Sequence, residues 1–324
     1  MHYNRSAFRK AASYCHRIIK DADQLYKKGG NGIQEGLKLF SDKLPILDNV
    51  QKRAAEYSDF DHDSSEICIN FAADAVLCLS HTANIKIQLR WQRGAFSAAK
   101  KLNRPKDIFI TGNNLGISLI KNKNEKEAIK ILKECLEIAE RTGSNEYKSK
   151  ALNNMGVAYK NLKNFSNAIE CYEKKLTLLE QHPEKILEKI SAMGNLGIAH
   201  KEKGEFEIAL EYHNKRLKLA KKEKYYPIIC RAYGDIGITY FNLKNIKKAI
   251  EFFDKQLKMA SKHNFHDSER KSKWGLCQAL HMKGDINNAI IVGKEALKLY
   301  EKDNDPFSTE VQNHLIDWMN ESGN

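Results

Sequence analysis

The sequence predicts an all-α solenoid in which antiparallel helix pairs stack side by side. Three observations predict it: five segments align without gaps, they recur every 40 or 41 residues, and small and apolar residues return at fixed places in each. Each segment contains a small residue, an alanine twelve residues later and a leucine twenty residues later. The small residues are Gly116, Gly156, Gly197, Gly237 and Cys277.

The alanines and leucines explain how each pair would pack. A small residue followed by alanine at a helix crossing lets two backbones approach closely, and the leucine fills the space between neighbouring pairs. The alanines are Ala128, Ala168, Ala209, Ala249 and Ala289, and the leucines are Leu136, Leu176, Leu217, Leu257 and Leu297. Such helix pairs cannot bury their apolar faces alone, so neighbouring pairs must stack.

A short turn separates the two helices of every pair. Its first residue suits the left-handed conformation that ends a helix, and its second is Asn or Asp in four of the five segments, which can cap the next helix. The turns are Lys123-Asn124, Lys163-Asn164, Gly204-Glu205, Lys244-Asn245 and Gly284-Asp285.

The flanking sequence predicts further helices. Residues 4–28 and 33–57 suggest two long helices, with Pro45 kinking or splitting the second, and Asp63 to Glu66 forms a capping-box pattern before a helix over about 64–81. A last helix is expected over about 307–321. The predicted organisation is an N-terminal helical segment (1–63), a divergent helix pair (64–104), five repeats (105–304) and a capping helix (305–324).

Composition limits the class of protein. Apolar residues make up 42% of 324 residues, and no apolar run approaches the ~18 residues of a membrane span. The N-terminus has charge but no apolar core of a signal peptide. Seven cysteines, without a CxxC pair, are expected to be buried thiols in a reducing compartment. We therefore expect a cytoplasmic protein without membrane contact.

The repeats resemble the tetratricopeptide repeat (TPR) family in its longer, roughly 40-residue form, over about residues 64–304. The small residue, the alanine and the turn match, as does the aromatic position held by Tyr159 and Tyr240, although His200 and Leu119 replace that aromatic elsewhere. The resemblance implies a right-handed TPR superhelix of about six helix pairs.

The N-terminal third carries a second resemblance. The segments LYKKGGNGIQEGLKLFSDKLPILDNVQ and LRWQRGAFSAAKKLN look like the lead-in to the TPR region of bacterial STAND-type (NB-ARC) ATPases, where that region acts as a sensor. The chain has no GxxxxGK[ST] phosphate-binding loop. The resemblance therefore implies a free-standing sensor or adaptor module.

The TPR resemblance also implies that the first helix of each pair lines a concave groove. The residues two before the small position are Asn114, Asn154, Asn195 and Asp235, and Gly275 breaks the series. They resemble the asparagine ladder with which kinesin light chain and Pins-type repeats hold the backbone of a peptide. A carboxamide suits this task because it both donates and accepts hydrogen bonds. The alternative is that these side chains bond carbonyls of the preceding repeat.

Apolar residues and cations surround this row. Ile117, Val157, Ile198 and Ile238 would form an apolar floor, or else pack between repeats. The remaining candidate binding residues are Lys121, Lys160, Lys201, Arg231 and Phe241. Together they suit an extended segment with acidic and apolar side chains. A carboxylate clamp for chaperone tails requires Asn where the apolar residues stand, so that ligand is disfavoured.

The charge of +13 permits a different ligand. Lys174, Lys215 and Lys255 share one repeat position and Lys218, Lys258 and Lys298 another, which could form a basic stripe for nucleic acid. Acidic neighbours and the low Arg content favour a solvated face instead, and we expect nucleic acid not to be the partner.

No catalytic motif is present, so we expect no enzyme activity and no cofactor. His263, His266 and Asp267 form the only tight histidine cluster, and an inter-repeat loop is favoured there over a metal site. The sequence predicts a non-enzymatic scaffold that binds a protein or peptide of acidic character. The alternatives are a signalling receptor resembling the peptide-sensing Rap type, whose N-terminal helices switch, and a nucleic-acid-binding solenoid.

Overall fold

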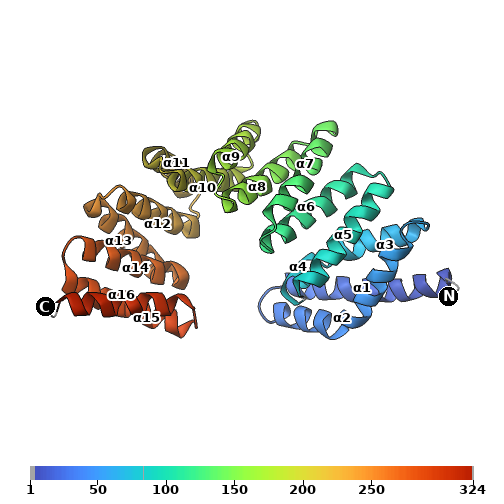
Figure 1. Cartoon of the computed structure of the whole chain (residues 1–324), viewed down its shortest axis with the longest axis horizontal. Coiled ribbons are helices and arrows are strands. Elements are labelled where there is room, and N and C mark those ends of the chain that lie inside the picture. The colour runs from blue at the N-terminus through green and yellow to red at the C-terminus, as the bar shows by residue number, and fades with distance from the viewer. Residues whose placement is uncertain (1–3, 83, 323–324) are drawn as a thin grey trace. The chain divides into compact units, whose positions relative to one another are not determined.

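The computed structural model describes residues 4–82 and 84–322, and this part of the chain consists of helices and turns without a strand (Figure 1). The all-α fold class predicted from the repeats is confirmed. The chain divides into two compact units, Met1–Leu178 and Leu179–Asn324, which are described separately.

The first unit holds a bundle of N-terminal helices followed by helix pairs. Consecutive helices from α5 to α8 pack against one another, and α1, α2 and α3 pack together before them. The helices are α1 (Arg5–Lys27), α2 (Asn31–Tyr57), α3 (His62–Asp74), α4 (Val76–Thr82), α5 (Ile85–Lys101), α6 (Pro105–Lys121), α7 (Glu125–Arg141), α8 (Asn145–Asn161) and most of α9 (Phe165–Glu180).

Two details of the N-terminal helices differ from the sequence-based expectation. Pro45 does not split its helix, because α2 runs unbroken through it. Pro45 and Ser41 are both exposed, so water can reach the carbonyl that the proline ring leaves without a donor. The helix expected over 64–81 is instead two helices, α3 and α4, with Ala75 between them.

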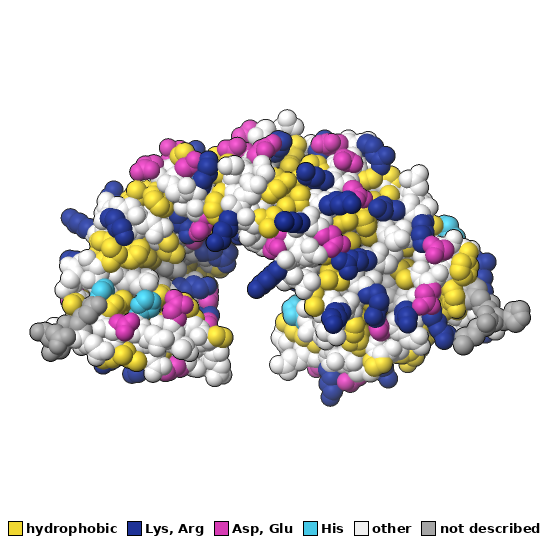
Figure 2. Space-filling model, viewed as in Figure 1, with side chains coloured by type: hydrophobic (Ala, Val, Ile, Leu, Met, Phe, Trp, Pro, Cys, Tyr) yellow, Lys and Arg dark blue, Asp and Glu magenta, His cyan; other side chains and the backbone are white. Residues whose placement is uncertain are grey.

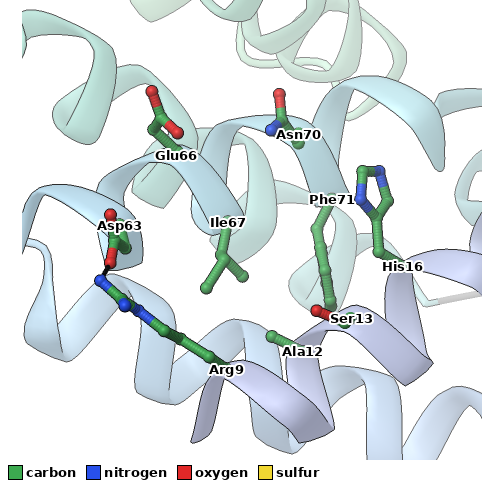
Figure 3. A pocket seen from close by; sticks show the side chains of 9 residues that line it. All are labelled: Arg9, Ala12, Ser13, His16, Asp63, Glu66, Ile67, Asn70 and Phe71. Carbon is green, nitrogen blue, oxygen red and sulfur yellow. Dashed lines mark ion pairs between the residues drawn. The ribbon is translucent and has the colours of Figure 1, made fainter. Parts of the chain in front are cut away.

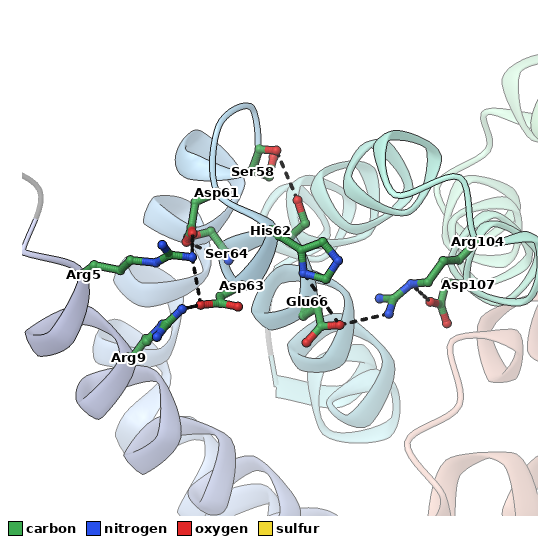
Figure 4. A network of polar contacts seen from close by, with 11 residues as sticks. Arg5, Arg9, Ser58, Asp61, His62, Asp63, Ser64, Glu66, Arg104 and Asp107 are labelled. Atoms are coloured by element: carbon green, nitrogen blue, oxygen red, sulfur yellow. Dashed lines mark hydrogen bonds and ion pairs between the residues drawn. The ribbon is translucent and has the colours of Figure 1, made fainter.

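The N-cap of α3 also lies two residues earlier than the capping-box pattern indicated. Asp61, not Asp63, is the N-cap, and its carboxylate accepts a hydrogen bond of 3.0 Å from the Ser64 backbone N–H. Asp63 and Glu66 are engaged elsewhere, by arginines of α1 and by Arg104 (Figure 4). These long-range ion pairs, which no local pattern shows, override the capping box.

The turns between the paired helices follow the prediction closely. Their first residues all have positive φ, from 57° at Lys123 to 88° at Gly204. Asn164, Asn245 and Asp285 each accept a hydrogen bond from a backbone N–H three residues later. Asn124 does not, because its amide donates to Glu127 instead.

The second unit is a stack of helix pairs that ends in a single helix. Consecutive helices pack against one another throughout, and α16 packs on α15 with Val311, Leu315 and Trp318 buried. The helices are α10 (Ile186–Lys203), α11 (Phe206–Lys222), α12 (Tyr226–Asn242), α13 (Ile246–His263), α14 (His266–Met282), α15 (Ile286–Lys302) and α16 (Phe307–Ser322).

Each small residue of the repeat faces one particular side chain, sixteen residues later on the second helix. A Cβ added at Gly156 would lie 2.5 Å from the Tyr172 ring, and one at Gly197 would lie 2.4 Å from the His213 ring. Gly116 faces Leu132 and Gly237 faces Phe253 in the same way. The glycine therefore makes room for a large side chain as well as for close backbone approach.

The fifth repeat reverses this arrangement. Cys277 stands where the other repeats have glycine, and Gly293 stands where they have the large residue. A Cβ at Gly293 would lie 2.7 Å from Cys277 Sγ and 2.5 Å from Leu315 of α16. In the fifth repeat the larger residue of this contact is therefore on the first helix and the glycine is on the second, the reverse of the other four repeats.

This contact yields a stability prediction. Gly156→Ala forces the buried Tyr172 ring out of its position, so we expect a loss of about 1–3 kcal/mol, as for other overpacked cores. Thermal unfolding followed by circular dichroism measures it. Ser191→Ala, at an exposed site of α10, is the control and should leave the melting temperature unchanged. Equal melting temperatures for Gly156→Ala and wild type would contradict the packing described.

Candidate functional site

The first helices of the repeats form one continuous surface within each unit. In the first unit α6 contacts α8, and in the second α10 contacts α12 and α12 contacts α14. The predicted polar row lies on these helices. Asn114, Asn154, Asn195 and Asp235 are all half-buried.

Asn154 links two neighbouring first helices of the first unit. Its amide donates a hydrogen bond of 2.8 Å to Asn113 Oδ1 on α6, and its Oδ1 accepts one of 3.2 Å from Asn153. The bond to the preceding repeat was the alternative expected from the sequence, although its acceptor is a side chain and not a backbone carbonyl. One amide hydrogen and one lone pair of Asn154 remain for a ligand.

Asp235 is held by a buried arginine. Arg216 of α11 donates to its carboxylate at 2.6 Å, and the Arg216 side chain is only 5% exposed. The guanidinium lies against Gly194, where an added Cβ would be 3.1 Å away. Asp235 is thus the partner of an internal cation, unlike the asparagines of its row.

Arg216 belongs to a buried polar position that the sequence analysis missed. Lys175, Arg216 and Gln256 each lie nineteen residues after the small residue, and all three are at least 94% buried. The other two repeats have Cys135 and Ala296 at this position. The sequence therefore did contain a signal for these residues, namely three polar side chains at a repeat position that is otherwise apolar. Lys175 donates to Asn153 at 2.9 Å.

A cleft of about 680 Å³ in the second unit lies among α12, α13 and α14 and extends to α15 and the start of α16. We call it the α12–α14 cleft. Three predicted site residues, Arg231, Asp235 and Phe241, line it. The other residues used below are Gly234, Ile238, Phe253, Gln256, Asp267, Lys271, Trp274, Gly275, Tyr300, Asp305 and Phe307.

A smaller cleft of about 270 Å³ lies on the first-helix surface of the first unit. Asn113 and Asn114 line it together with Tyr147 and Lys150. The Tyr147 ring stacks on Phe109 with centroids 4.0 Å apart, which holds one wall in place.

The three predicted lysines lie outside these two clefts. Lys121 is exposed, Lys160 is half-buried, and neither has an acidic partner among the described residues. Lys201 is paired with Glu202 at 2.8 Å.

A polar cleft of about 370 Å³ separates α1 from α3 in the first unit (Figure 3). Its sides are joined by charged contacts: Arg9 to Asp63, and Arg5 to Asp61 at 2.6 Å (Figures 3 and 4). At its far end, His16 Nε2 lies 2.6 Å from Asp74 Oδ2. The contact between these helices is therefore partly polar and open to solvent.

The first lysine row is neutralised within its own helices. Lys174 lies 2.7 Å from Glu170, Lys215 lies 4.0 Å from Glu211, and Lys255 pairs with Glu251, each one turn earlier. Lys258 of the second row pairs with Asp254 at 2.6 Å. Figure 2 shows the same mixing of cationic and anionic side chains over the visible face. Four of the six lysines of the two rows thus have an acidic neighbour one turn away on their own helix.

Reactive groups are scarce in the described part of the chain. All seven cysteines are buried and free, and burial raises the pKa of the Cys68 and Cys135 thiols to about 12, so they are protonated at neutral pH. His263 stacks between Tyr226 and Phe265. Across residues 4–82 and 84–322, no three His, Cys, Asp or Glu side chains gather as a metal site would require.

Within the same residues, every helix is too short or too polar to cross a lipid bilayer.

Comparison with known families identifies the repeats. Tetratricopeptide repeat models match residues 107–181, 151–222 and 231–263, which cover α6 to α11 and most of α12 and α13. These segments are tetratricopeptide repeats. The predicted TPR resemblance is thereby confirmed.

Several solved structures are similar to this chain in fold. The STAND protein with a tetratricopeptide repeat sensor from Pyrococcus horikoshii has a TM-score of 0.64 at 18% identity, and the match covers 92% of this chain and 47% of that one. The apo form of RapI has a TM-score of 0.59 at 12% identity, and the match covers 88% of this chain and 99% of RapI. BtubC from P. vanneervenii has a TM-score of 0.60 at 16% identity, and the match covers 68% of this chain and 93% of BtubC. A search of curated protein sequences finds no match.

The buried His213 beneath Gly197 makes stability depend on pH. It is fully buried, neither ring nitrogen has a hydrogen-bond partner, and burial lowers the pKa of His213 to about 4. The unfolded chain, with an ordinary histidine pKa of about 6.5, binds the proton first. Acid therefore favours unfolding over the window from about pH 6.5 to 4, and the folded state gains as pH rises.

We predict that wild type loses about 2 kcal/mol more than His213→Phe when the pH falls from 7 to 5. Phenylalanine occupies the same register at Phe253, so the replacement suits the site. Urea unfolding at the two pH values measures the difference. The same loss in both proteins would show that another group is responsible.

Proposed function

We propose that this chain is a non-enzymatic scaffold or adaptor that binds a partner protein or extended peptide along the first-helix surface of its TPR repeats. The observation that carries the proposal is the half-buried asparagines on first helices of both units, Asn114 and Asn154 on α6 and α8 of the first unit and Asn195 on α10 of the second, beside partly exposed apolar side chains. Neighbouring residues of that surface are Ile117, Val157 and Ile198, all half-buried, and Ile238, which is 41% exposed.

The chemistry of this surface suits a peptide backbone. An extended peptide presents N–H and C=O groups in alternation, and a carboxamide can bond either without selecting a side chain. Apolar side chains beside the amides would cover alternate side chains of the peptide. The surface therefore offers affinity through the backbone and selectivity through its apolar positions.

Uncompensated cations favour an acidic ligand. Lys121, Lys160 and Arg231 have no acidic partner among the described residues, whereas the outward lysines of the second helices mostly do. A ligand carboxylate would therefore meet free cations on the first-helix surface and already paired ones on the opposite helices.

A peptide selection tests the proposal. A phage-displayed library of random dodecapeptides is selected on the full chain, and the enriched peptides are measured against Asn154→Ala combined with Asn195→Ala. We expect about a tenfold or greater loss of affinity, since each lost hydrogen bond contributes ~0.5–1.5 kcal/mol. The melting temperature should fall by only a few degrees, because Asn154 also bonds Asn113 and Asn153, and binding is compared at a temperature where the variant is folded. Lys218→Ala, at an exposed site of α11, is the control.

Two results would contradict the scaffold proposal or its site. Failure to enrich any peptide counts against peptide binding itself. Unchanged affinity of the double asparagine variant places the peptide elsewhere on the chain.

A second candidate function is a sensor whose N-terminal helices move when a ligand binds the repeats. It is favoured by the contact between α1 and α3, which contains a cleft open to solvent and, beside the buried apolar face of α1, ion pairs such as Arg5–Asp63 and Arg9–Asp63. These two pairs are partly exposed and contribute ~0–1 kcal/mol each, so a ligand-driven shift of α1 would lose little from them. The matches to RapI and to the STAND protein cover 88% and 92% of this chain, which is more than the five repeats alone.

The sensor model predicts that a selected peptide changes hydrogen exchange in α1. Residues 5–27 should exchange faster or slower by several fold in the complex, and small-angle scattering should change in parallel. A passive scaffold would show protection only at the bound surface. An unchanged α1 and an unchanged scattering profile would exclude the switch.

A further inference from the structure

The α12–α14 cleft differs from the rest of the first-helix surface because it is deep, aromatic and lined by an unpartnered polar group. We propose that this cleft is an anchoring site for one aromatic side chain of a bound peptide that is next to an acidic residue. The inference rests on the proposed peptide-binding function and names the side chains that this part of the surface recognises.

Two glycines let large side chains pack directly on the backbone at the floor of the cleft. A Cβ at Gly234 would lie 2.6 Å from the Gln256 carboxamide, and one at Gly275 would lie 2.6 Å from the Phe253 ring. Where the other repeats have Asn or Asp two residues before the small position, the fifth has Gly275. At the break in the polar row, the Phe253 ring therefore lies on the backbone of Gly275, where the other repeats have a polar side chain.

Gln256 provides a hydrogen-bonding group at this floor. The residue is 6% exposed, and no described side chain or backbone group bonds its carboxamide. The carboxamide faces the solvent of the cleft, so a ligand group that bonds it replaces water and gains a net ~0.5–1.5 kcal/mol. A peptide N–H or C=O is the group that a carboxamide pairs with best.

The walls of the cleft are aromatic. Trp274 packs edge-on to Phe307 with centroids 6.1 Å apart, and Tyr300 packs on Phe307 at 5.2 Å. Phe241 lies across from them on α12. Aromatic rings prefer edge-to-face or offset packing with another ring, which favours an aromatic ligand side chain over an aliphatic one.

The charges at the rim select the residue beside the aromatic. Asp235 is paired with Arg216, Asp267 with Arg270 and Lys271, and Asp305 with Arg270 at 3.1 Å. All three carboxylates are therefore compensated by the protein itself. Arg231 is exposed and has no acidic partner among the described residues. It is the cation of the cleft that a ligand carboxylate can pair with.

The segment leading into α16 completes the cleft. Asp305 and Phe307 come from the turn and first residue of this helix, and they line the cleft with Tyr300 of α15. The C-terminal helix thus contributes to binding in addition to covering the last repeat.

The test uses the phage selection above and two variants of the full chain. Peptides enriched on wild type should share an aromatic residue adjacent to Asp or Glu. A synthetic copy of an enriched peptide is then measured by fluorescence polarisation. Gln256→Met should weaken it about tenfold without lowering the melting temperature, because the amide has no internal bond to lose.

Arg231→Gln should weaken the acidic peptide about threefold and should not affect a copy in which the acidic residue is Asn. Replacing the aromatic residue of the peptide by Ala should abolish the difference between wild type and Gln256→Met. Lys218→Gln, an exposed charge change on α11, is the matched control and should bind like wild type.

The outcomes separate the two proposals. If peptides are enriched but bind both cleft variants like wild type, while the double asparagine variant fails to bind, the scaffold function stands and this anchoring site is wrong. If no peptide is enriched, both proposals fail. Enrichment of aliphatic or basic sequences would overturn the stated specificity.

Discussion

The contact between the small residue of each first helix and the residue sixteen positions later determines how every repeat packs. A missing Cβ on one helix admits a leucine, tyrosine, histidine or phenylalanine from the other. Because protein interiors are close-packed, this single fit fixes both the spacing of the two helices and their rotation about their axes. The surface that each first helix presents to a ligand follows from that rotation, so the core contact and the binding surface are set together.

Buried polar side chains beside this contact distinguish the repeats of the second unit from one another. Arg216 neutralises Asp235 from within, whereas Gln256, at the equivalent place one repeat later, has nothing to bond. Neighbouring repeats with the same backbone therefore present different chemistry: one internal ion pair and one carboxamide without a protein partner. Under the proposed function, selectivity would arise from such differences between equivalent positions.

Much of the fold follows from the sequence, because each repeat specifies its own local geometry. The positive-φ turn residues and the alanine and glycine registers all lie within one helix pair, and they were predictable residue by residue. Features that depend on distant residues were not. Asp61 capping α3, Pro45 inside an intact α2 and Arg216 beside Asp235 depend on partners or solvent exposure that no local pattern encodes. The α12–α14 cleft was found only in part, through Arg231, Asp235 and Phe241, because its aromatic walls come from three further elements.

The reversed contact between Cys277 and Gly293 limits where a repeat could be gained or lost during evolution. The first four repeats have the small and large partners in the same order, so duplication or loss of one of them by recombination would preserve that contact. The fifth is matched instead to α16 through Gly293 and Leu315. An additional repeat inserted after it would meet a surface shaped for a different neighbour. Variation in the length of the array is therefore expected inside it, while its terminal repeat and last helix are inherited as one block.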